Sequence, residues 1–363
     1  MKNNPPTPPP PNETQRSPDD QPEKFNAWDP KILKHVDALI DLVKPPKQGE
    51  DNRDLVRQMI VTALQAQYSQ LERSDFKIMA RSTREFRYGF NIFKDYRHRL
   101  KVTIFGSART HATHPEYKQA LLFARKMSRY GFMAITGAGP GIMQAGNEGA
   151  GVGNSFGINI RLPFEQEANT FISKDPRFID CRFFFTRKLM FLKETNAVAF
   201  FPGGFGTHDE AYETLTLVQT GKCDMIPMVF VDAPGGRYWK DWKEYVTRHL
   251  LKTRKISHED MNLFKVTDSV DQAVAEILRF YNNYHSMRFV KDQLVIRLQK
   301  PATQELLRDL NRDFSDICVK GSYKASSALP EENDHADLPR IIFPFDRLHF
   351  GRLRMLVDRL NKE

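Results

Sequence analysis

Cysteine is scarce in this sequence, with only Cys181, Cys223 and Cys318 among 363 residues. They lie far apart and lack the paired spacing of a disulfide framework, a zinc site or a redox pair. No apolar run approaches the roughly 20 residues that span a bilayer, and the start, MKNNPPTPPPPNETQ, lacks the charged-then-apolar plan of a signal peptide. We therefore expect a cytoplasmic protein without disulfides, without a metal site and without a membrane partner.

A concentrated basic tract is also missing. The formal net charge is +9, but lysine and arginine are spread along the chain. Such a balance suits anionic partners, and a nucleotide explains it as well as nucleic acid does. We expect a small anionic ligand and do not expect nucleic acid as a partner.

Changes in composition and period divide the chain into four predicted regions. Residues 1–28 are proline-rich and polar, which predicts a disordered tail. Residues 29–98 have helical periodicity, as in PKILKHVDALIDLV, and predict an N-terminal helical segment that packs on the next domain or on a second subunit. Residues 99–284 and 285–363 follow as a larger and a smaller folded region.

In region 99–284, short apolar runs alternate with helical patterns. The runs are KVTIFGS (101–107), FMAITG (132–137), FGINIRLP (156–163), AVAFFPGG (197–204) and MIPMVFVD (225–232). This alternation predicts an α/β fold of Rossmann-like type, a doubly wound parallel sheet with helices on both faces. Ligands of such sheets bind beyond the carboxyl ends of the strands, which selects the loops that start at Gly106, Gly137 and Gly203.

Region 285–363 reads as strand, helix, strand, strand and helix, which predicts a small α+β module of ferredoxin-like type. Its polar connector, SALPEENDHADLP, is typical of an exposed hairpin loop. No constellation of catalytic side chains stands out here, so we expect a role in regulation or oligomerisation.

The loop TGAGPGIMQAGNEGAG (136–151) follows a predicted strand and opens a helix, so its glycines and free N–H groups suit an anion. The dinucleotide fingerprint requires a third glycine where Ile142 stands, and an acidic residue is missing from the next strand. Neither glycine loop carries the lysine and serine or threonine of a P-loop. An NAD-dependent oxidoreductase and an ATPase are therefore disfavoured, and we expect no cofactor.

The stretch FPGGFGTHDEAYETL (201–215) places acidic side chains directly after a glycine turn. One interpretation is structural: Thr207 and Glu210 form a capping box, with Thr207 at the helix N-cap. The other is chemical, because bare glycine amides that hold a phosphate and a carboxylate that faces the anomeric carbon suit glycosyl transfer. Arg187 and Lys188 could supply the cation, although their helix runs towards the start of the next strand, so they could act from a neighbouring part of the rim or across a subunit interface.

These motifs resemble those of the Lonely Guy (LOG) family, once labelled lysine decarboxylases. The resemblance covers about residues 100–250 and rests on TGAGPGIMQAGNEGA, TRKLMF and PGGFGTHDE, where every position of PGGxGTxxE is filled. It implies a homodimer or higher oligomer that hydrolyses nucleoside 5′-monophosphates to free base and ribose 5-phosphate, without a metal. The implied catalytic pair is Arg187 and Glu210. The expected substrate-binding residues are Gly106, Ser107, Gly137, Gly139, Gly141, Met143, Lys188, Pro202, Gly203, Gly204, Gly206 and Thr207.

The chain departs from the family pattern at Ala138 and Gln144, where many members have glycine and glutamate, and at His208-Asp209. The extra terminal regions favour ordinary nucleotides over cytokinin precursors as substrates. Two other functions remain open. A non-catalytic carrier would bind a nucleotide or a phosphorylated cofactor without releasing base, and an RNA-binding protein would show steep salt dependence.

Overall fold

A computed structural model of the chain describes residues 30–43, 51–162 and 168–362. The proline-rich segment 1–28, predicted to be disordered, lies outside the described residues. The chain divides into two compact units, Met1–Ala80 and Arg81–Glu363. Within the described ranges, every helix falls short of the length and apolar character that crossing a bilayer requires.

The first unit is helical. It contains α1 (Pro30–Leu42), α2 (Arg53–Tyr68) and the beginning of α3 (Arg73–Phe93). Val36, Ile40 and Ala66 are buried between these helices, and an ion pair of 2.7 Å joins Arg57 to Asp37. Many other apolar side chains of these helices are exposed; among them are Leu39, Leu42, Leu55, Met59 and Tyr68.

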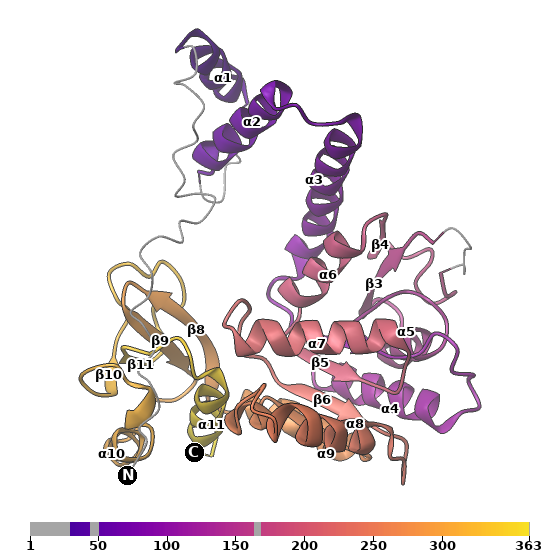
Figure 1. Ribbon diagram of the computed structural model, residues 1–363, viewed down its shortest axis with the longest axis vertical. Coiled ribbons are helices and arrows are strands. Elements are labelled where there is room, and N and C mark those ends of the chain that lie inside the picture. The colour runs from indigo at the N-terminus through magenta and orange to yellow at the C-terminus, as the bar shows by residue number, and fades with distance from the viewer. Residues whose placement is uncertain (1–29, 44–50, 163–167, 363) are drawn as a thin grey trace. The chain divides into compact units, whose positions relative to one another are not determined.

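The second unit is built on a parallel sheet of seven strands in the order β4-β3-β2-β1-β5-β6-β7 (Figure 1). The strands are β1 (Lys101–Phe105), β2 (Met133–Thr136), β3 (Ser155–Ile160), β4 (Phe178–Cys181), β5 (Ala197–Phe200), β6 (Met228–Val231) and β7 (Phe264–Thr267). The predicted α/β fold of Rossmann-like type is confirmed. The order reverses at β1, whose neighbours are β2 and β5, so the topological switch point lies there.

Helices cover both faces of this sheet. They are α4 (Pro115–Arg129), α5 (Ile142–Ala150), α6 (Phe184–Lys193), α7 (Phe205–Gln219), α8 (Tyr238–Val246) and α9 (Val270–Phe280), with short turns at Lys94–Tyr96, Thr247–Leu251 and Glu259–Asn262. Buried side chains of α4, α5 and α9 form the core on one face. Those of α6, α7 and α8 form the core on the other. Alternate side chains of the central strands β1, β2, β5 and β6 enter the two cores, which is why these strands read as continuous apolar runs.

The C-terminal module is a four-stranded antiparallel sheet in the order β10-β11-β9-β8. Its elements are β8 (Tyr284–Val290), β9 (Gln293–Leu298), α10 (Gln304–Asp313), a short turn Ser315–Ile317, β10 (Lys324–Ser326), β11 (Arg340–Phe343) and α11 (Phe350–Leu360). The first predicted strand is thus a hairpin, because Lys291 takes a left-handed conformation with φ of 52° and reverses the chain. The resulting order of two strands, helix, two strands and helix differs from the predicted ferredoxin-like order.

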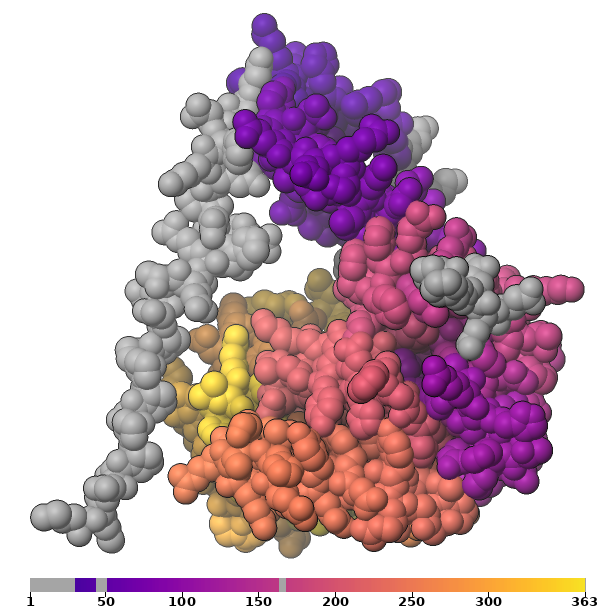
Figure 2. Space-filling model, turned by 45° about the vertical axis from the view of Figure 1, so that its right-hand side comes forward, coloured from indigo at the N-terminus to yellow at the C-terminus, as the bar shows by residue number. Residues whose placement is uncertain are grey.

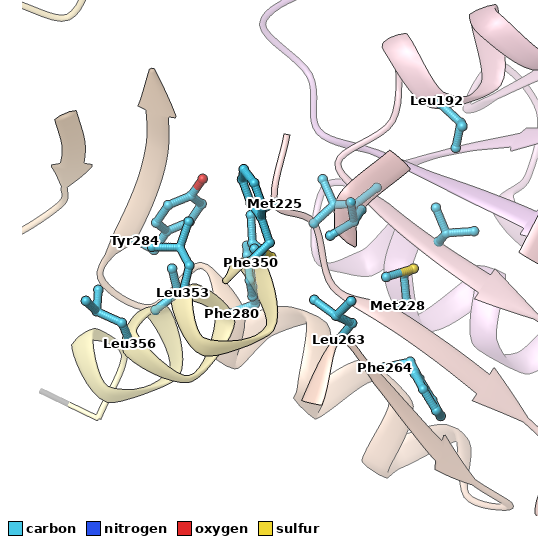
Figure 3. Close-up of a cluster of buried hydrophobic side chains, with 14 of the residues drawn as sticks. Leu192, Met225, Met228, Leu263, Phe264, Phe280, Tyr284, Phe350, Leu353 and Leu356 are labelled. Carbon is cyan, nitrogen blue, oxygen red and sulfur yellow. The ribbon is translucent and has the colours of Figure 1, made fainter. Parts of the chain in front are cut away.

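The module shares a core with the large sheet. The ring of Phe350 lies so close to Gly221, at the end of α7, that a Cβ on this glycine would meet its Cζ at 2.0 Å. Figure 3 shows Phe350 beside Met225, with the cluster continuing through Leu263 towards β6. In the space-filling view the yellow C-terminal segment borders the pink surface of α7 (Figure 2).

Candidate functional site

The loops after β1, β2 and β5 meet at the carboxyl edge of the large sheet. Ser107 joins them, because its N–H donates to the Pro202 carbonyl at 3.1 Å and its own carbonyl accepts from the Ile142 N–H at 3.0 Å. Gly106 leaves no room for a side chain, since a Cβ would lie 2.6 Å from Cγ2 of Ile142. The structure therefore brings the three predicted glycine loops to one place, at the switch point of the sheet.

The glycines of the turn after β5 serve different purposes. A Cβ on Gly203 would lie 2.1 Å from Oγ1 of Thr207, so close packing requires glycine at this position. A Cβ on Gly204 or Gly206 would have no neighbouring atom within 4 Å among the described residues. Tight packing accounts for the first glycine only, and the other two leave backbone open to a ligand.

The predicted capping box is wrong. Helix α7 begins at Phe205 with Gly204 as its N-cap, and no side chain bonds the cap. Thr207 is therefore the third helical residue, because the extended backbone at Gly204 leads directly into the helix. Among the described residues, the N–H groups of Gly204, Phe205 and Gly206 have no hydrogen-bond acceptor. Open amides at a helix N-terminus attract anions.

The turn after β2 is held in an unusual conformation. Ala138 has φ of 62°, in the left-handed region that favours glycine. The side-chain amide of Asn169 donates to the carbonyls of Ala138 at 2.9 Å and Gly139 at 3.0 Å. Gly141, with φ of 66°, then precedes α5. Asn169 was not predicted, because it acts on backbone carbonyls from a distant segment and belongs to no motif.

Arg187, on the first turns of α6, reaches into the same edge of the sheet. Its Nε donates to the Ile158 carbonyl at 2.8 Å, and a Cβ on Gly137 would lie 2.2 Å from its Nη2 and 2.6 Å from Sδ of Met143. Burial lowers the pKa of Arg187, while the nearby Glu210 carboxylate opposes that shift. Because Gly137 has no side chain, the guanidinium of Arg187 has room to lie beside it.

The position of Arg187 decides between two arrangements that the sequence left open, action from a neighbouring part of the rim or across a subunit interface. Helix α6 runs towards the start of β5, as expected, and it begins at the carboxyl end of β4, a strand that the sequence analysis missed. Because Arg187 stands near the start of α6, it reaches the glycine loops within its own chain.

Glu210 is the most unusual side chain of the site. It is only 7% exposed, and its Oε2 has no hydrogen-bond partner among the described residues. Burial raises its pKa to about 7, against the opposing effect of the Lys188 and Arg187 cations. Leaving a buried polar atom unpaired costs about 1–3 kcal/mol, more when it is charged. Such groups concentrate at functional sites.

Lys188 is engaged by the acidic side chains of α7. Its Nζ lies 2.6 Å from Oε2 of Glu213, 2.8 Å from Oδ2 of Asp209 and 3.8 Å from Oε2 of Glu210. Burial acts against its charge, but the hydrogen bonds to Asp209 and Glu213 raise the pKa of Lys188. This ammonium therefore balances the carboxylates beside the glycine turn, which explains how acidic residues can follow a turn with open backbone amides.

Tyr238, the first residue of α8, was also not predicted. Its hydroxyl donates to the Gly203 carbonyl at 2.5 Å and lies 2.7 Å from Nε2 of His208. A signal was present in the sequence, because VDAPGGRYW is a further glycine loop that follows a strand, at the same edge of the sheet.

Among the described residues, no group of three or more histidine, cysteine or acidic side chains could hold a metal ion. Two surface hollows, of about 460 and about 470 Å³, lie between α1 and α2 and between α4 and α9, so neither contains Glu210. Chemistry rather than cavity size identifies the site.

Comparison with known proteins places these residues in a family. Residues 137–277 match the family model described as "Possible lysine decarboxylase". A comparison with curated proteins gave no match. Among solved structures, the chain is similar to the structural genomics target TM1055, with 19% identity, a TM-score of 0.37 and coverage of 50% of this chain and 99% of that one.

Two other solved structures are similar over half of the chain. The molybdenum cofactor carrier protein of Chlamydomonas reinhardtii has 18% identity and a TM-score of 0.35, covering 50% of this chain and 97% of that one. DNA processing protein A of Helicobacter pylori has 11% identity and a TM-score of 0.35, covering 50% and 80%. The segment that matches the family model, residues 137–277, carries Arg187 and Glu210, so the predicted resemblance to the family described as possible lysine decarboxylase, the LOG family, is confirmed over that segment.

Proposed function

We propose that the protein hydrolyses the N-glycosidic bond of nucleoside 5′-monophosphates and releases free base and ribose 5-phosphate. One observation carries the proposal: a buried carboxylate, Glu210, has an unpartnered oxygen close to a turn whose backbone amides are open. The match of residues 137–277 to the LOG family model supports a nucleotide-related function. The amides suit the phosphate at one end of a ribose 5-phosphate group, and the carboxylate suits C1′ at the other end.

In the proposed reaction the bond between C1′ and the base nitrogen breaks, and the oxygen of a water molecule bonds to C1′. Glu210 stabilises the positive charge that develops on the sugar. One proton of the water ends on the leaving base. A carboxyl group with a pKa of about 7 can accept and release that proton at neutral pH.

The other side chains have supporting roles in this proposal. The open N–H groups at the start of α7 bind the phosphate. Arg187 orients the phosphate or the leaving base beside Glu210, and Lys188 keeps Asp209 and Glu213 from repelling the substrate. The turns at Gly106–Ser107 and Gly137–Met143 line the remaining part of the nucleotide site.

The test is to incubate the purified protein with AMP, GMP, IMP, CMP, UMP and a cytokinin ribotide, and to measure free base by chromatography. We expect base release by the wild type and a loss of about 10²-fold or more in turnover for Glu210→Gln, the scale of a lost electrostatic stabiliser. Full activity of the variant would contradict the role of Glu210. A nucleotide that raises the melting temperature without losing its base would instead indicate a carrier.

We also propose that the protein is a homo-oligomer. Apolar side chains beside the site are exposed on α6 and α7; they are Phe184 at 53%, Phe185 at 50%, Leu189 at 45% and Phe205 at 96%. Large apolar side chains that are exposed in such number near a site are typical of an interface. Light scattering of the full chain tests this, since a mass of 42.1 kDa, that of one chain, would contradict it.

A further inference from the structure

Tyr238 bonds the glycine turn after β5, and His208 bonds Tyr238. The Tyr238 hydroxyl lies 2.5 Å from the Gly203 carbonyl oxygen and 2.7 Å from Nε2 of His208. A phenol has a single proton to donate, and a carbonyl can only accept. Tyr238 therefore donates to Gly203 and accepts from the N–H of His208, which assigns the proton of the imidazole to Nε2.

This pair is anchored on rigid parts of the fold. The buried Asp232 carboxylate, directly after β6, accepts from the Trp239 N–H at 3.0 and 3.1 Å and so fixes the start of α8, where Tyr238 stands. The imidazole of His208 lies 5.4 Å from the ring of Trp239, which packs on Phe230 at 4.8 Å. These contacts fix the positions of Tyr238 and His208 relative to the large sheet.

The hydrogen bond at Gly203 fixes more than one atom. In a trans peptide the C=O of Gly203 and the N–H of Gly204 lie in one plane and point in opposite directions. Holding the carbonyl towards Tyr238 therefore holds the Gly204 N–H away from it. That N–H has no acceptor among the described residues, and a Cβ on Gly204 would meet none of their atoms within 4 Å.

We propose that Tyr238 and His208 are positioning residues that orient the Gly203–Gly204 peptide so that its N–H binds the 5′-phosphate of the substrate. The inference rests on the proposed function in placing the phosphate at this turn. Independently, the buried Glu210 oxygen that lacks a hydrogen-bond partner favours a ligand at this end of α7. His208, at which the chain departs from the family pattern, then acts on the phosphate and not on the base.

The first test is Tyr238→Phe, which removes only the hydroxyl. We expect the Kd for ribose 5-phosphate, measured by calorimetry, and the KM for AMP each to rise about tenfold, equal to about 1.4 kcal/mol. The kcat for AMP and the cleavage of adenosine, which lacks the phosphate, should change less than about twofold. Tyr245→Phe is the matched control, because this tyrosine lies on the same helix and is 52% exposed.

The second test separates positioning from packing. His208→Leu should raise the Kd for ribose 5-phosphate about as much as Tyr238→Phe does, and the double variant should raise it little further than either single variant. His208→Gln keeps an N–H donor, so it should recover most of the affinity. Lower melting temperatures with unchanged Kd values would overturn the inference. Cleavage of AMP by wild type and variants with equal KM would overturn it as well, while leaving the proposed function intact.

Failure of the proposed function has a different signature. If the wild type releases no base but binds ribose 5-phosphate, and Tyr238→Phe weakens that binding, the hydrolase is excluded and the positioning role stands. If the wild type cleaves AMP without measurable affinity for ribose 5-phosphate, and KM is equal for AMP and adenosine, the positioning role is excluded.

Discussion

At the scale of single residues, one of the three carboxylates near Lys188 differs from the other two in its contacts. Asp209 and Glu213 lie at hydrogen-bond distance from the Lys188 ammonium, whereas Glu210 lies 3.8 Å away from it. Two negative charges are thus balanced by direct contact, and the third is buried with an unpartnered oxygen. The free energy that this arrangement costs must be offset by the rest of the fold.

That cost predicts a pH-dependent stability. Burial raises the pKa of Glu210 from 4.5 to about 7, so its contribution to stability is fully present below pH 4.5 and is lost as the pH rises through 7. The difference corresponds to about 3 kcal/mol. In urea unfolding, we expect Glu210→Gln to gain about that much stability over the wild type between pH 4.5 and 8.

A control for this experiment is Glu244→Gln, which makes the same chemical change at a side chain that is 61% exposed. This variant should follow the wild type across the range. Parallel pH profiles for the wild type and Glu210→Gln would show that Glu210 ionises as an ordinary carboxylate.

The open glycines of the β5 turn give a second prediction. An alanine at position 206 meets nothing within 4 Å and has a better helix propensity than glycine by up to about 1 kcal/mol. Gly206→Ala should therefore keep or raise the melting temperature. A methyl group in the space that we assign to the ligand should weaken ribose 5-phosphate binding about tenfold or more, as an added methylene does in a fitted site.

Gly203→Ala supplies the comparison, because its Cβ would lie 2.1 Å from Thr207 Oγ1 and must disturb the turn. Here we expect a lower melting temperature together with weaker binding. Equal affinity in Gly206→Ala and the wild type would remove this side of the turn from the ligand site.

At the scale of elements, the sequence predicts the strands that are fully buried and misses those that are only partly buried. Strands β1, β2 and β5 are fully buried, so each appears as a continuous apolar run. Strands β4 and β7 have four residues each with mixed burial, and such segments resemble loops. Because β4 was missed, the sequence left open whether Arg187 reaches the glycine loops within its own chain or across a subunit interface.

The site shows the same division. Arg187 and Glu210 could be predicted because the motif specifies their residue types and spacing. Asn169 could not, because it holds backbone carbonyls from a distant segment and any suitable donor would serve. Tyr238 follows a glycine loop that the sequence does show, but no motif specifies its bond to the Gly203 carbonyl. The capping box failed because T-x-x-E also fits a helix that begins two residues before its threonine.

The loop between β10 and β11 gives a prediction at this scale. It was expected to be exposed, yet Glu332 within it is buried and lies 2.7 Å from both Arg297 and Arg340. Glu332→Gln would leave two buried guanidinium groups without that charge, which typically costs 3–5 kcal/mol. We expect a fall of about this size in the free energy of unfolding, measured in urea.

Its neighbour Glu331 is the matched control. Glu331 pairs with Lys291 at the surface, where both side chains are substantially exposed, and exposed pairs contribute about 0–1 kcal/mol. Glu331→Gln should therefore be nearly neutral. Similar stabilities for the two variants would mean that the buried ions do not hold this loop.

At the scale of the second unit, the large sheet and the C-terminal module share one hydrophobic core. The cluster includes Val198 and Phe200 of β5 as well as Leu294 and Ile296 of β9. The Phe350 ring over Gly221 joins α11 to the end of α7, the helix that carries Glu210. Packing of this kind makes the two sheets one cooperative unit.

Hydrogen exchange can test that cooperativity. Peptides that cover β5 and β9 should have the same free energy of opening, and Phe350→Ala should lower both by about 3–5 kcal/mol, the usual cost of removing a buried phenylalanine. Leu348→Ala is the control, because this side chain is 71% exposed and should affect neither strand. If β9 opens well before β5, or if Phe350→Ala lowers the protection of β9 alone, the module folds as a separate domain and its contact with α7 cannot transmit a change to the site.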